Sequence, residues 1–239
     1  MSDDLLIEDE GALRILTLNR PERRNAFTAP AYQLLADALR AADVDEAVKV
    51  VLVRGAGKGF SSGVDLETLA SNGPDGPLAA AFDSLLAALV EVDVVILGAV
   101  HGAAIGVGAT MLGHFDYVVV AEDTKVRFPF APMGILPEAA SSWTLPRLVG
   151  LQPATEILLS GRLLTGEEAV ALGLAAESLP AEDVESRARE IAASFVDHDR
   201  EVLRATKRLI RAPRRAEVTE ALLLERVEAG ELGARRSSS

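Results

Sequence analysis

Short apolar runs alternate with helical periodicities along the first two-thirds of the chain. Two runs, at residues 5–8 and 14–18, flank Gly11 and predict a β-hairpin at the start of the fold. Further runs of the length and composition typical of buried strands follow at residues 48–53, 94–100 and 117–121. The strands therefore recur at intervals that leave room for a helix between them.

Between the predicted strands, apolar residues recur at the spacing of an amphipathic helix. Thr28 can cap a helix whose apolar residues recur three and four positions apart as far as about Ala42. A second amphipathic helix is indicated around residues 82–89. The order of strand, turn and helix predicts an α/β layer structure with right-handed crossovers.

The last third of the chain is predicted to be mostly helical. Thr165 and Glu168 have the spacing of a capping box, and Gly173 is suited to end the helix that they begin. Helical spacing then continues over residues 184–229. Strand signals are sparse in this part, so it differs in character from the first two-thirds.

We therefore divide the chain into a core, residues 1–190, and a C-terminal helical region, residues 191–239. The tail from Ala234 onward is expected to be frayed. Residues 72–77 are rich in Gly, Pro, Asn and Asp, and we expect them to form a mobile surface loop. We find no internal repeat.

Composition narrows the class of protein. The chain has 239 residues, 49% of them hydrophobic, which is enough for one substantial core. A formal net charge of −12 argues against nucleic acid or an anionic membrane as a partner. The absence of cysteine excludes disulfides, and the acidic N-terminus and short apolar runs differ from a signal peptide or a membrane span. We expect a soluble, cytoplasmic protein without a metal centre.

One segment, residues 204–215, is strongly basic in this acidic chain. Such a segment is commonly a solvated face of a helix. The alternative is a site for phosphates or a contact between subunits.

Closely spaced glycines interrupt the apolar sequence at residues 99–110. Gly102, Gly106 and Gly108 allow the backbone to approach a ligand closely, and a helix beginning near Gly106 would offer unpaired N–H groups to negative charge. This pattern predicts strand, tight loop and helix start, with an anion or oxyanion site at the turn. The alternative is that the small residues only let a buried helix pack closely on a sheet.

Other polar residues are weaker candidates for chemistry. No histidine lies at a sequence spacing that would suggest a base for Ser61 or Ser62. We therefore expect these serines to have a role in the loop rather than to act as nucleophiles. His101 follows a predicted strand and is interpreted as structural. His114 and Asp116 could pair at a buried junction.

Four segments together resemble the crotonase superfamily, the enoyl-CoA hydratase/isomerase family. They are NRPERRNA at residues 19–26, FSSGVDL at residues 60–66, the glycine-rich stretch, and residues 163–174, in the order and spacing of that family. The resemblance implies a crotonase-like spiral of ββα units with C-terminal helices. It also implies a homotrimer or a dimer of trimers, and an acyl-CoA thioester substrate. Coenzyme A then enters as part of the substrate, and no separate cofactor is expected.

The resemblance also implies a set of site residues. By position, the backbone N–H groups of Val64 and Val107 would hold the thioester oxygen, in agreement with the oxyanion interpretation of the glycines. The β-branched Val107 would narrow the pocket beside the thioester. Residues expected along the coenzyme are Arg23, Arg24, Asn25, Ala26, Ser62, Asp65, Leu66 and Gly106.

The choice of reaction depends on carboxylates. Family hydratases use two glutamates, and the corresponding positions here hold Thr110 and Phe130, which cannot perform carboxylate acid–base chemistry. Glu138, in the run LPEAASS, resembles the catalytic glutamate of peroxisomal-type Δ3,Δ2-enoyl-CoA isomerases. One carboxylate suffices for a 1,3 proton shift, so Glu138 is the predicted base.

The apolar residues around Glu138 are expected to raise its pKa: Phe130, Met133, Ile135 and Trp143. The alternative role for Glu138 is a favourable interaction with a helix N-terminus near Ser141. Alternative functions are weak enoyl-CoA hydration, thioester hydrolysis or dehalogenation, or a catalytically silent acyl-CoA-binding or scaffold protein.

Overall fold

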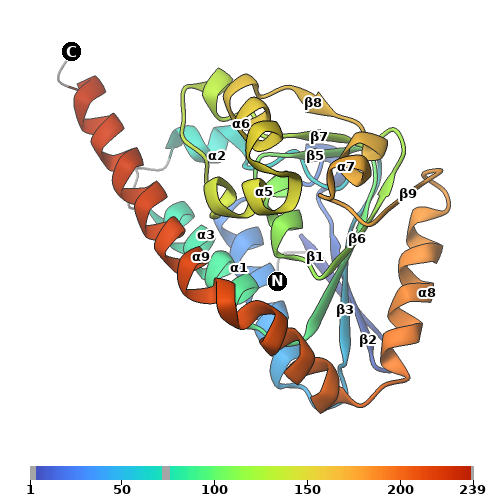
Figure 1. Cartoon of the computed structure of the whole chain (residues 1–239). Coiled ribbons are helices and arrows are strands. Elements are labelled where there is room, and N and C mark those ends of the chain that lie inside the picture. Colours follow the sequence, from blue (N-terminus) through green and yellow to red (C-terminus); the bar gives the residue numbers. More distant parts are fainter. Residues whose placement is uncertain (1–3, 72–75, 238–239) are drawn as a thin grey trace.

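The computed structural model describes residues 4–71 and 76–237, drawn in colour in Figure 1. As expected, the fold opens with a hairpin, in which β1 (Leu5–Glu10) runs antiparallel to β2 (Leu13–Leu18). Gly11 lies in the connecting turn with a φ of 63°, which a residue without Cβ adopts at little cost. The other strands of this sheet add in parallel, in the order β1-β2-β3-β4-β6-β9.

The parallel strands have helices on both sides, as the α/β pattern predicts. These strands are β3 (Val50–Gly55), β4 (Val95–Val100), β6 (Tyr117–Ala121) and β9 (Glu177–Leu179). Helices α1 (Ala29–Val44) and α3 (Pro77–Glu91) cover one face, and α8 (Val184–Val196) covers the other (Figure 1).

Alternate strand residues form two separate apolar cores because successive side chains of a strand point to opposite faces. Val51, Val53 and Ile96 belong to the larger core with α1 and α3, whereas Val50 and Leu52 pack toward α8 in the smaller one. Thr28 caps α1 as predicted, since its side chain accepts from the Ala31 N–H at 3.3 Å.

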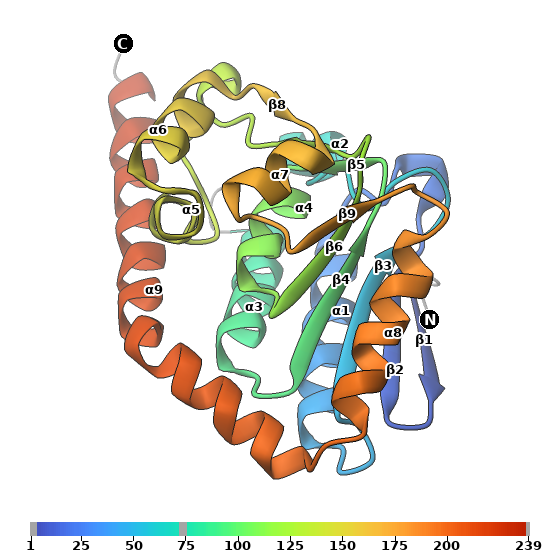
Figure 2. The ribbon, with the colours of Figure 1, turned by 45° about the vertical axis from the view of Figure 1, so that its right-hand side comes forward.

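A second, three-stranded sheet and several short helices lie at one end of the main sheet (Figures 1 and 2). The strands are β5 (Ala103–Ile105), β7 (Lys125–Arg127) and β8 (Leu163–Leu164). The short elements are η1 (Pro21–Arg23), α2 (Leu66–Ser71), α4 (Val107–Thr110), η2 (Met111–His114), η3 (Ala131–Met133), α5 (Ser141–Val149), α6 (Leu151–Ser160) and α7 (Gly166–Leu172). The capping box at Thr165 and the left-handed Gly173 bound α7 as predicted.

Two loop predictions need correction. The stretch between β4 and α4 is not a simple tight loop, because residues 103–105 form β5 and pair with β7. Pro77 begins α3 instead of ending a loop, because proline suits the first position of a helix. Gly76 is the N-cap residue of α3, and residues 72–75 of the predicted loop lie outside the described residues.

The C-terminal helix α9 (Arg200–Ser237) crosses the side of the molecule that carries α1 and α3 (Figure 2). It is helical through Ser237, so the frayed tail predicted from Ala234 is wrong for residues 234–237. The division placed at residue 190 falls within α8, which packs on the main sheet. No helix of the described residues is long and apolar enough to cross a membrane.

The basic segment of α9 is only partly solvated: Arg208 and Arg215 are exposed and pair with Asp93, whereas other basic residues of the segment are buried in ion pairs. Lys207 and Arg211 are about 95% buried, and each lies 2.7 Å from a carboxylate oxygen of Asp116. Arg204 pairs with Asp43 at 2.7 Å. Pattern analysis missed this role because the acidic partners lie far away in the sequence, on elements that α9 reaches only in the folded chain.

Candidate active site

A cleft of about 830 Å³ opens beside the second sheet. Its walls come from α1 and α3, from the loop after β3, from the turn before α4, and from residues 127–138. The cleft brings together most of the residues predicted for the site: Arg23, Arg24, Ala26, Ser62, Val64, Asp65, Leu66, Gly106, Val107 and Glu138. Asn25 is the one predicted site residue that does not line it.

Two glycine turns form one wall, residues 62–64 and 106–108. They are joined through backbone pairing, since the Ser61 N–H donates to the Ala103 carbonyl and the Ile105 N–H donates to the Ser61 carbonyl, at 2.8 and 2.9 Å. Gly63 and Gly106 both have positive φ, 91° and 56°. A Cβ on Gly63 would lie 2.8 Å from the Ile105 carbonyl oxygen, so the close approach of the turns requires glycine.

Each glycine turn presents an unpaired backbone donor. Phe27 bonds to Gly63 and Asp65 on either side of Val64, which turns the Val64 N–H away from Phe27. Val107 is the first residue of α4, where a helical N–H has no partner within the helix. Within residues 4–71 and 76–237, neither N–H donates a hydrogen bond. Both can therefore donate to a ligand in the cleft.

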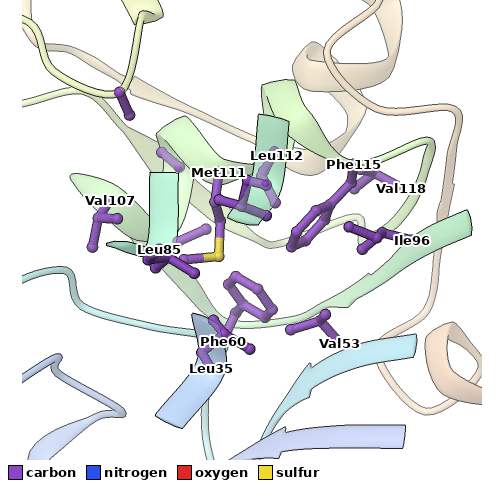
Figure 3. Close-up of a cluster of buried hydrophobic side chains, with 14 of the residues drawn as sticks. Leu35, Val53, Phe60, Leu85, Ile96, Val107, Met111, Leu112, Phe115 and Val118 are labelled. Carbon is purple, nitrogen blue, oxygen red and sulfur yellow. The ribbon is translucent and has the colours of Figure 1, made fainter. Parts of the chain in front are cut away.

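The Val107 side chain packs into the larger core and is 1% exposed. Figure 3 shows it among the buried side chains of this core, which include Leu85 and Met111. Most of its surface therefore contacts the core, although Val107 also lines the cleft. Gly108 behind it also allows close packing, since a Cβ there would lie 2.8 Å from the Ser61 carbonyl oxygen. Close packing is therefore observed at Gly108, whereas the oxyanion site at the turn stays a prediction.

Arg23 and Arg24 lie at the mouth of the cleft, where both side chains are exposed. Arg23 is 3.5 Å from Glu67 across the opening. Asn25 is buried instead, because its side-chain amide donates to the Ala56 and Gly59 carbonyls at 2.9 and 2.8 Å. The Asn25 side chain therefore supports a neighbouring loop, and Asn25 does not line the cleft.

The loop after β3 is held by its own polar side chains. Ser61 is fully buried and donates to the Asn25 carbonyl at 2.8 Å, which confirms its loop role. Asp65 accepts from the Thr68 N–H at 3.0 Å and faces Arg20 at 3.5 Å. The Thr68 hydrogen bond lowers the pKa of Asp65 below its usual value, despite some burial. Asp65 lines the cleft, but its carboxylate is engaged in the protein.

Glu138 is half-buried and lines the cleft, directly before two residues with left-handed backbone. Ala139 and Ala140 have φ values of 60° and 54°, which residues with Cβ rarely adopt. In the described part of the chain, the Glu138 carboxyl receives no hydrogen bond. Burial and the neighbouring Glu225 carboxylate raise the pKa of Glu138 to about 7.

The helix N-terminus near Ser141 is occupied by Glu225 rather than by Glu138. The Ala140 and Ser142 N–H groups donate to the Glu225 carboxylate at 2.8 and 3.0 Å, and the Ser142 hydroxyl donates at 2.6 Å. The structural alternative for Glu138 is therefore wrong. Sequence reasoning missed Glu225 because it is one of several acidic residues on α9, and nothing in its neighbours marks its contact 85 residues away.

The residues at the two hydratase positions differ in location. Thr110 is buried outside the cleft wall, and its hydroxyl donates to the Val107 carbonyl at 3.4 Å. Phe130 lines the cleft together with Met133 and Ile135. Trp143, also expected near Glu138, donates instead to Glu217 of α9 at 3.2 Å.

Tyr32 of α1 is a cleft residue that the pattern analysis assigned only to the core. Its ring is 2% exposed, stacks on Phe27 at 4.7 Å and lies 5.3 Å from the Phe82 ring. Burial, and secondarily the charge of Glu138, raise the pKa of Tyr32 well above its usual value. Its hydroxyl therefore stays protonated near neutral pH and cannot serve as a base.

The remaining candidates have structural contacts. His101 is 3.0 Å from the Gly57 carbonyl, in keeping with its structural interpretation. His114 does not pair with Asp116, because Nε2 of His114 contacts the Ala139 carbonyl at 2.8 Å whereas Asp116 holds Lys207 and Arg211. Burial lowers the pKa of His114 to about 4, so the ring is neutral at physiological pH.

The fold and the cleft place the chain among α/β proteins of the crotonase type, and similarity to known proteins gives the family. Residues 8–237 match the enoyl-CoA hydratase/isomerase family. A structure of an enoyl-CoA hydratase/isomerase from Pseudoalteromonas atlantica T6c is similar with a TM-score of 0.90 and 33% identity, over 96% of this chain and 91% of that one. The chain belongs to the enoyl-CoA hydratase/isomerase family.

Relatives in this family include proteins named as isomerases and proteins named as hydratases. The chain is 34% identical to enoyl-CoA delta isomerase 2 of Rattus norvegicus, over 88% of this chain and 55% of that protein. It therefore spans about half the length of the rat protein. It is also 29% identical to 2,3-dehydroadipyl-CoA hydratase of Escherichia coli (strain K12), over 93% of this chain and 88% of that protein.

Proposed function

We propose that this protein is a Δ3,Δ2-enoyl-CoA isomerase that uses Glu138 as its single acid–base group. The observation that carries the proposal is the pairing of one half-buried carboxyl, its pKa near 7, with two unpaired N–H donors in the same cleft. The other carboxylates of the cleft wall are Glu22, Asp65 and Glu67, which are located with Arg23 and Arg24 in the wall. Asp65 and Glu67 are already engaged by arginines.

The proposed reaction moves one proton between two carbons of the substrate. The thioester oxygen accepts hydrogen bonds from the Val64 and Val107 N–H groups, which stabilise negative charge on that oxygen. Glu138 removes a proton from C2 of a 3-enoyl-CoA, and the electron pair of the broken C–H bond forms a dienolate. The same carboxyl then delivers its proton to C4, which gives the 2-enoyl-CoA. A carboxyl with a pKa near 7 is suited to both steps, because both of its protonation states are accessible at neutral pH.

Hydration would need more than this cleft offers. A hydratase must activate a water molecule and protonate a carbon, and the resemblance places its two glutamates at positions 110 and 130. Here the first position is a buried hydroxyl bonded to backbone and the second is a phenyl ring. We therefore propose isomerisation in preference to hydration, hydrolysis, dehalogenation or a silent binding role.

Coenzyme A is proposed to enter as part of the substrate. Arg23 and Arg24 at the mouth offer positive charge to its phosphates, while Ala26, Ser62 and Leu66 line the path inward. The inner cleft is apolar, with Tyr32, Phe82 and Phe130 among its walls, and fits the acyl chain. This arrangement lets the charged end of the ligand remain near solvent while the reacting carbons reach Glu138.

The test compares the two reactions directly. Purified protein should convert a 3-enoyl-CoA into the 2-enoyl-CoA much faster than it hydrates the 2-enoyl-CoA. Glu138→Gln keeps the size of the side chain but removes its basicity, so kcat for isomerisation should fall by at least about 10²-fold. Acyl-CoA binding, followed as a rise in the unfolding temperature, should persist. Near-normal isomerisation by Glu138→Gln, or fast hydration by the wild type, would overturn the proposal.

We also propose assembly into a homotrimer or a dimer of trimers. Apolar side chains are exposed along α9 and would be covered by a neighbouring subunit: Leu209, Ile210, Leu223, Leu224 and Val227. Light scattering coupled to size-exclusion chromatography gives the mass directly. A monomer at micromolar concentration would contradict this assembly.

A further inference from the structure

The turn that carries Glu138 has no capping side chain of its own. Helix α5 begins at Ser141, and its N-cap residue is Ala140, which has no side-chain oxygen to accept the free N–H groups. Ala139 and Ala140 also hold left-handed backbone angles without the freedom of glycine. We call residues 138–142 the glutamate turn. Its conformation must therefore be stabilised from outside.

Glu225 supplies that support from α9. It accepts from two backbone N–H groups and one hydroxyl of the glutamate turn, those of Ala140 and Ser142. On the other side of the turn, His114 contacts the Ala139 carbonyl at 2.8 Å. Within the turn, the Ser141 N–H donates to the Glu138 carbonyl at 3.0 Å, and the Ala140 carbonyl accepts from the Trp143 and Thr144 N–H groups at 3.0 and 2.8 Å. Glu225 thus supplies the acceptors for the Ala140 and Ser142 N–H groups, which lie next to the proposed base.

The same carboxylate is the main charge acting on Glu138. The titratable groups facing Glu138 are Glu225 from α9 and Tyr32 from α1, with His114 behind the turn and Arg127 in the cleft wall. Tyr32 and His114 are uncharged near pH 7, since their pKa values are shifted to well above and well below that range. Arg127 donates to the Gly161 carbonyl at 2.6 Å.

Two neighbouring carboxyls with unequal hydrogen bonding do not ionise together. Burial raises the pKa of Glu225, but its three donors from the glutamate turn oppose this and favour the ionised form. Burial and the negative charge of Glu225 both raise the pKa of Glu138, and no hydrogen-bond donor within the described residues opposes them. Glu225 therefore ionises first, and Glu138 keeps its proton to higher pH.

We propose that Glu225 is a positioning residue for the reaction proposed above, which fixes the glutamate turn and makes Glu138 harder to ionise by placing a negative charge beside it. This inference rests on the proposed function for its catalytic meaning. The coupling between the two carboxyls can be measured without any activity. A residue on the C-terminal helix then adjusts the pH range in which the cleft works.

The test is a ¹³C NMR titration of glutamate side chains, with the Glu138 signal assigned by its absence in Glu138→Gln. In the wild type, the midpoint of Glu138 should lie near 7. Glu225→Gln removes the negative charge and should lower this midpoint by about one pH unit. Glu228→Gln is the matched control, because Glu228 is exposed on the same helix and should leave the midpoint unchanged.

A second variant distinguishes the effect of the Glu225 charge from the effect of its hydrogen bonds to the glutamate turn. Glu225→Asp keeps the charge on a shorter side chain, so the Glu138 midpoint should stay within a few tenths of a pH unit while the unfolding temperature falls. In the isomerase assay, the acid limb of the kcat/KM profile should move to lower pH in Glu225→Gln and stay in place in Glu225→Asp. A purely structural role would lower both stability and rate without moving either midpoint.

An unchanged Glu138 midpoint in folded Glu225→Gln would overturn the proposal whatever the activity. If Glu225→Gln does not fold, a midpoint near the ordinary glutamate value in Glu225→Asp would overturn it equally. A shifted NMR midpoint in a protein without isomerase activity would count against the proposed reaction and support the coupling. The two failures are therefore distinguishable.

Discussion

The glycine turns and the glutamate turn both contribute residues to the wall of one cleft, but they are built in different ways. The glycine turns, residues 62–64 and 106–108, present backbone N–H groups, and their shape follows from glycines at positive φ and from backbone pairing between the two segments. The glutamate turn presents a side chain, and both its backbone and its charge depend on Glu225, 85 residues after Ala140. Backbone chemistry is thus specified by adjacent residues, whereas side-chain chemistry is specified by distant packing.

The largest expected effect comes from removing one backbone donor. Val107→Pro should lower kcat for isomerisation by about 10²–10³-fold, because proline lacks the N–H and yet suits the first position of a helix. Val107→Ala keeps the N–H and should change kcat only slightly, while costing on the order of 2 kcal/mol of stability from the cavity in the core. Equal losses of kcat in the two folded variants would show that the side chain, and not the backbone donor, is needed.

The raised pKa of Glu138 in the glutamate turn predicts how the stability of the protein depends on pH. The pKa of Glu138 is near 7 in the folded state and near 4.5 when unfolded, so the folded state retains a proton that the unfolded state has lost. Stability should therefore fall between pH 4.5 and 7 through this group, by as much as roughly 3 kcal/mol. Glu138→Gln should remove this loss and be more stable than the wild type at pH 8.

Denaturant unfolding at pH 4.5 and pH 8 measures that difference. Glu228→Gln serves as the control, since its exposed side chain should change stability little at either pH. If Glu138→Gln were less stable than the wild type at pH 8, the ionised carboxylate would be a stabilising group and the burial argument would fail.

The next prediction concerns Asn25, whose side chain is hydrogen-bonded to the loop that precedes the glycine turn at residues 62–64. Asn25→Ala should lower the free energy of unfolding by on the order of 2 kcal/mol, because the Ala56 and Gly59 carbonyls lose their donor and alanine is strained at a φ of 55°. Asn25→Gly removes only the hydrogen bonds and should cost less. KM for acyl-CoA should change little in either folded variant, and a KM increase larger than that of an Arg24 variant would restore Asn25 to the binding site.

The smallest effect is expected at the mouth of the cleft. Arg24→Ala should raise KM for acyl-CoA several-fold, in keeping with an exposed charge contact of up to about 1 kcal/mol. Added salt should weaken binding by the wild type more than by the variant, since salt screens exposed charges. Lys58→Ala changes an exposed cation outside the cleft wall and should leave KM unchanged. The same KM increase in both variants would indicate a general effect of net charge.

The sequence by itself determined the parts of this protein that depend on neighbouring residues. Apolar runs and helical spacing predicted the hairpin, the central strands, α1 with its Thr28 cap, and the capping box of α7, because each signal lies within a few residues of the element it forms. The glycine spacing likewise predicted the turn before α4. Glu138 was found through its resemblance to a family motif, and the structure places it in the cleft.

Only the tertiary structure decided how charges are paired. The basic residues of α9 could be interpreted as a solvated face or a phosphate site until the fold placed Lys207 and Arg211 against Asp116. Asn25 does not line the cleft, because its amide donates to carbonyls of another loop. The role of Glu225 depends on where α9 crosses the glutamate turn. Burial and distance set the energy of a charge, and neither quantity is present in a linear sequence.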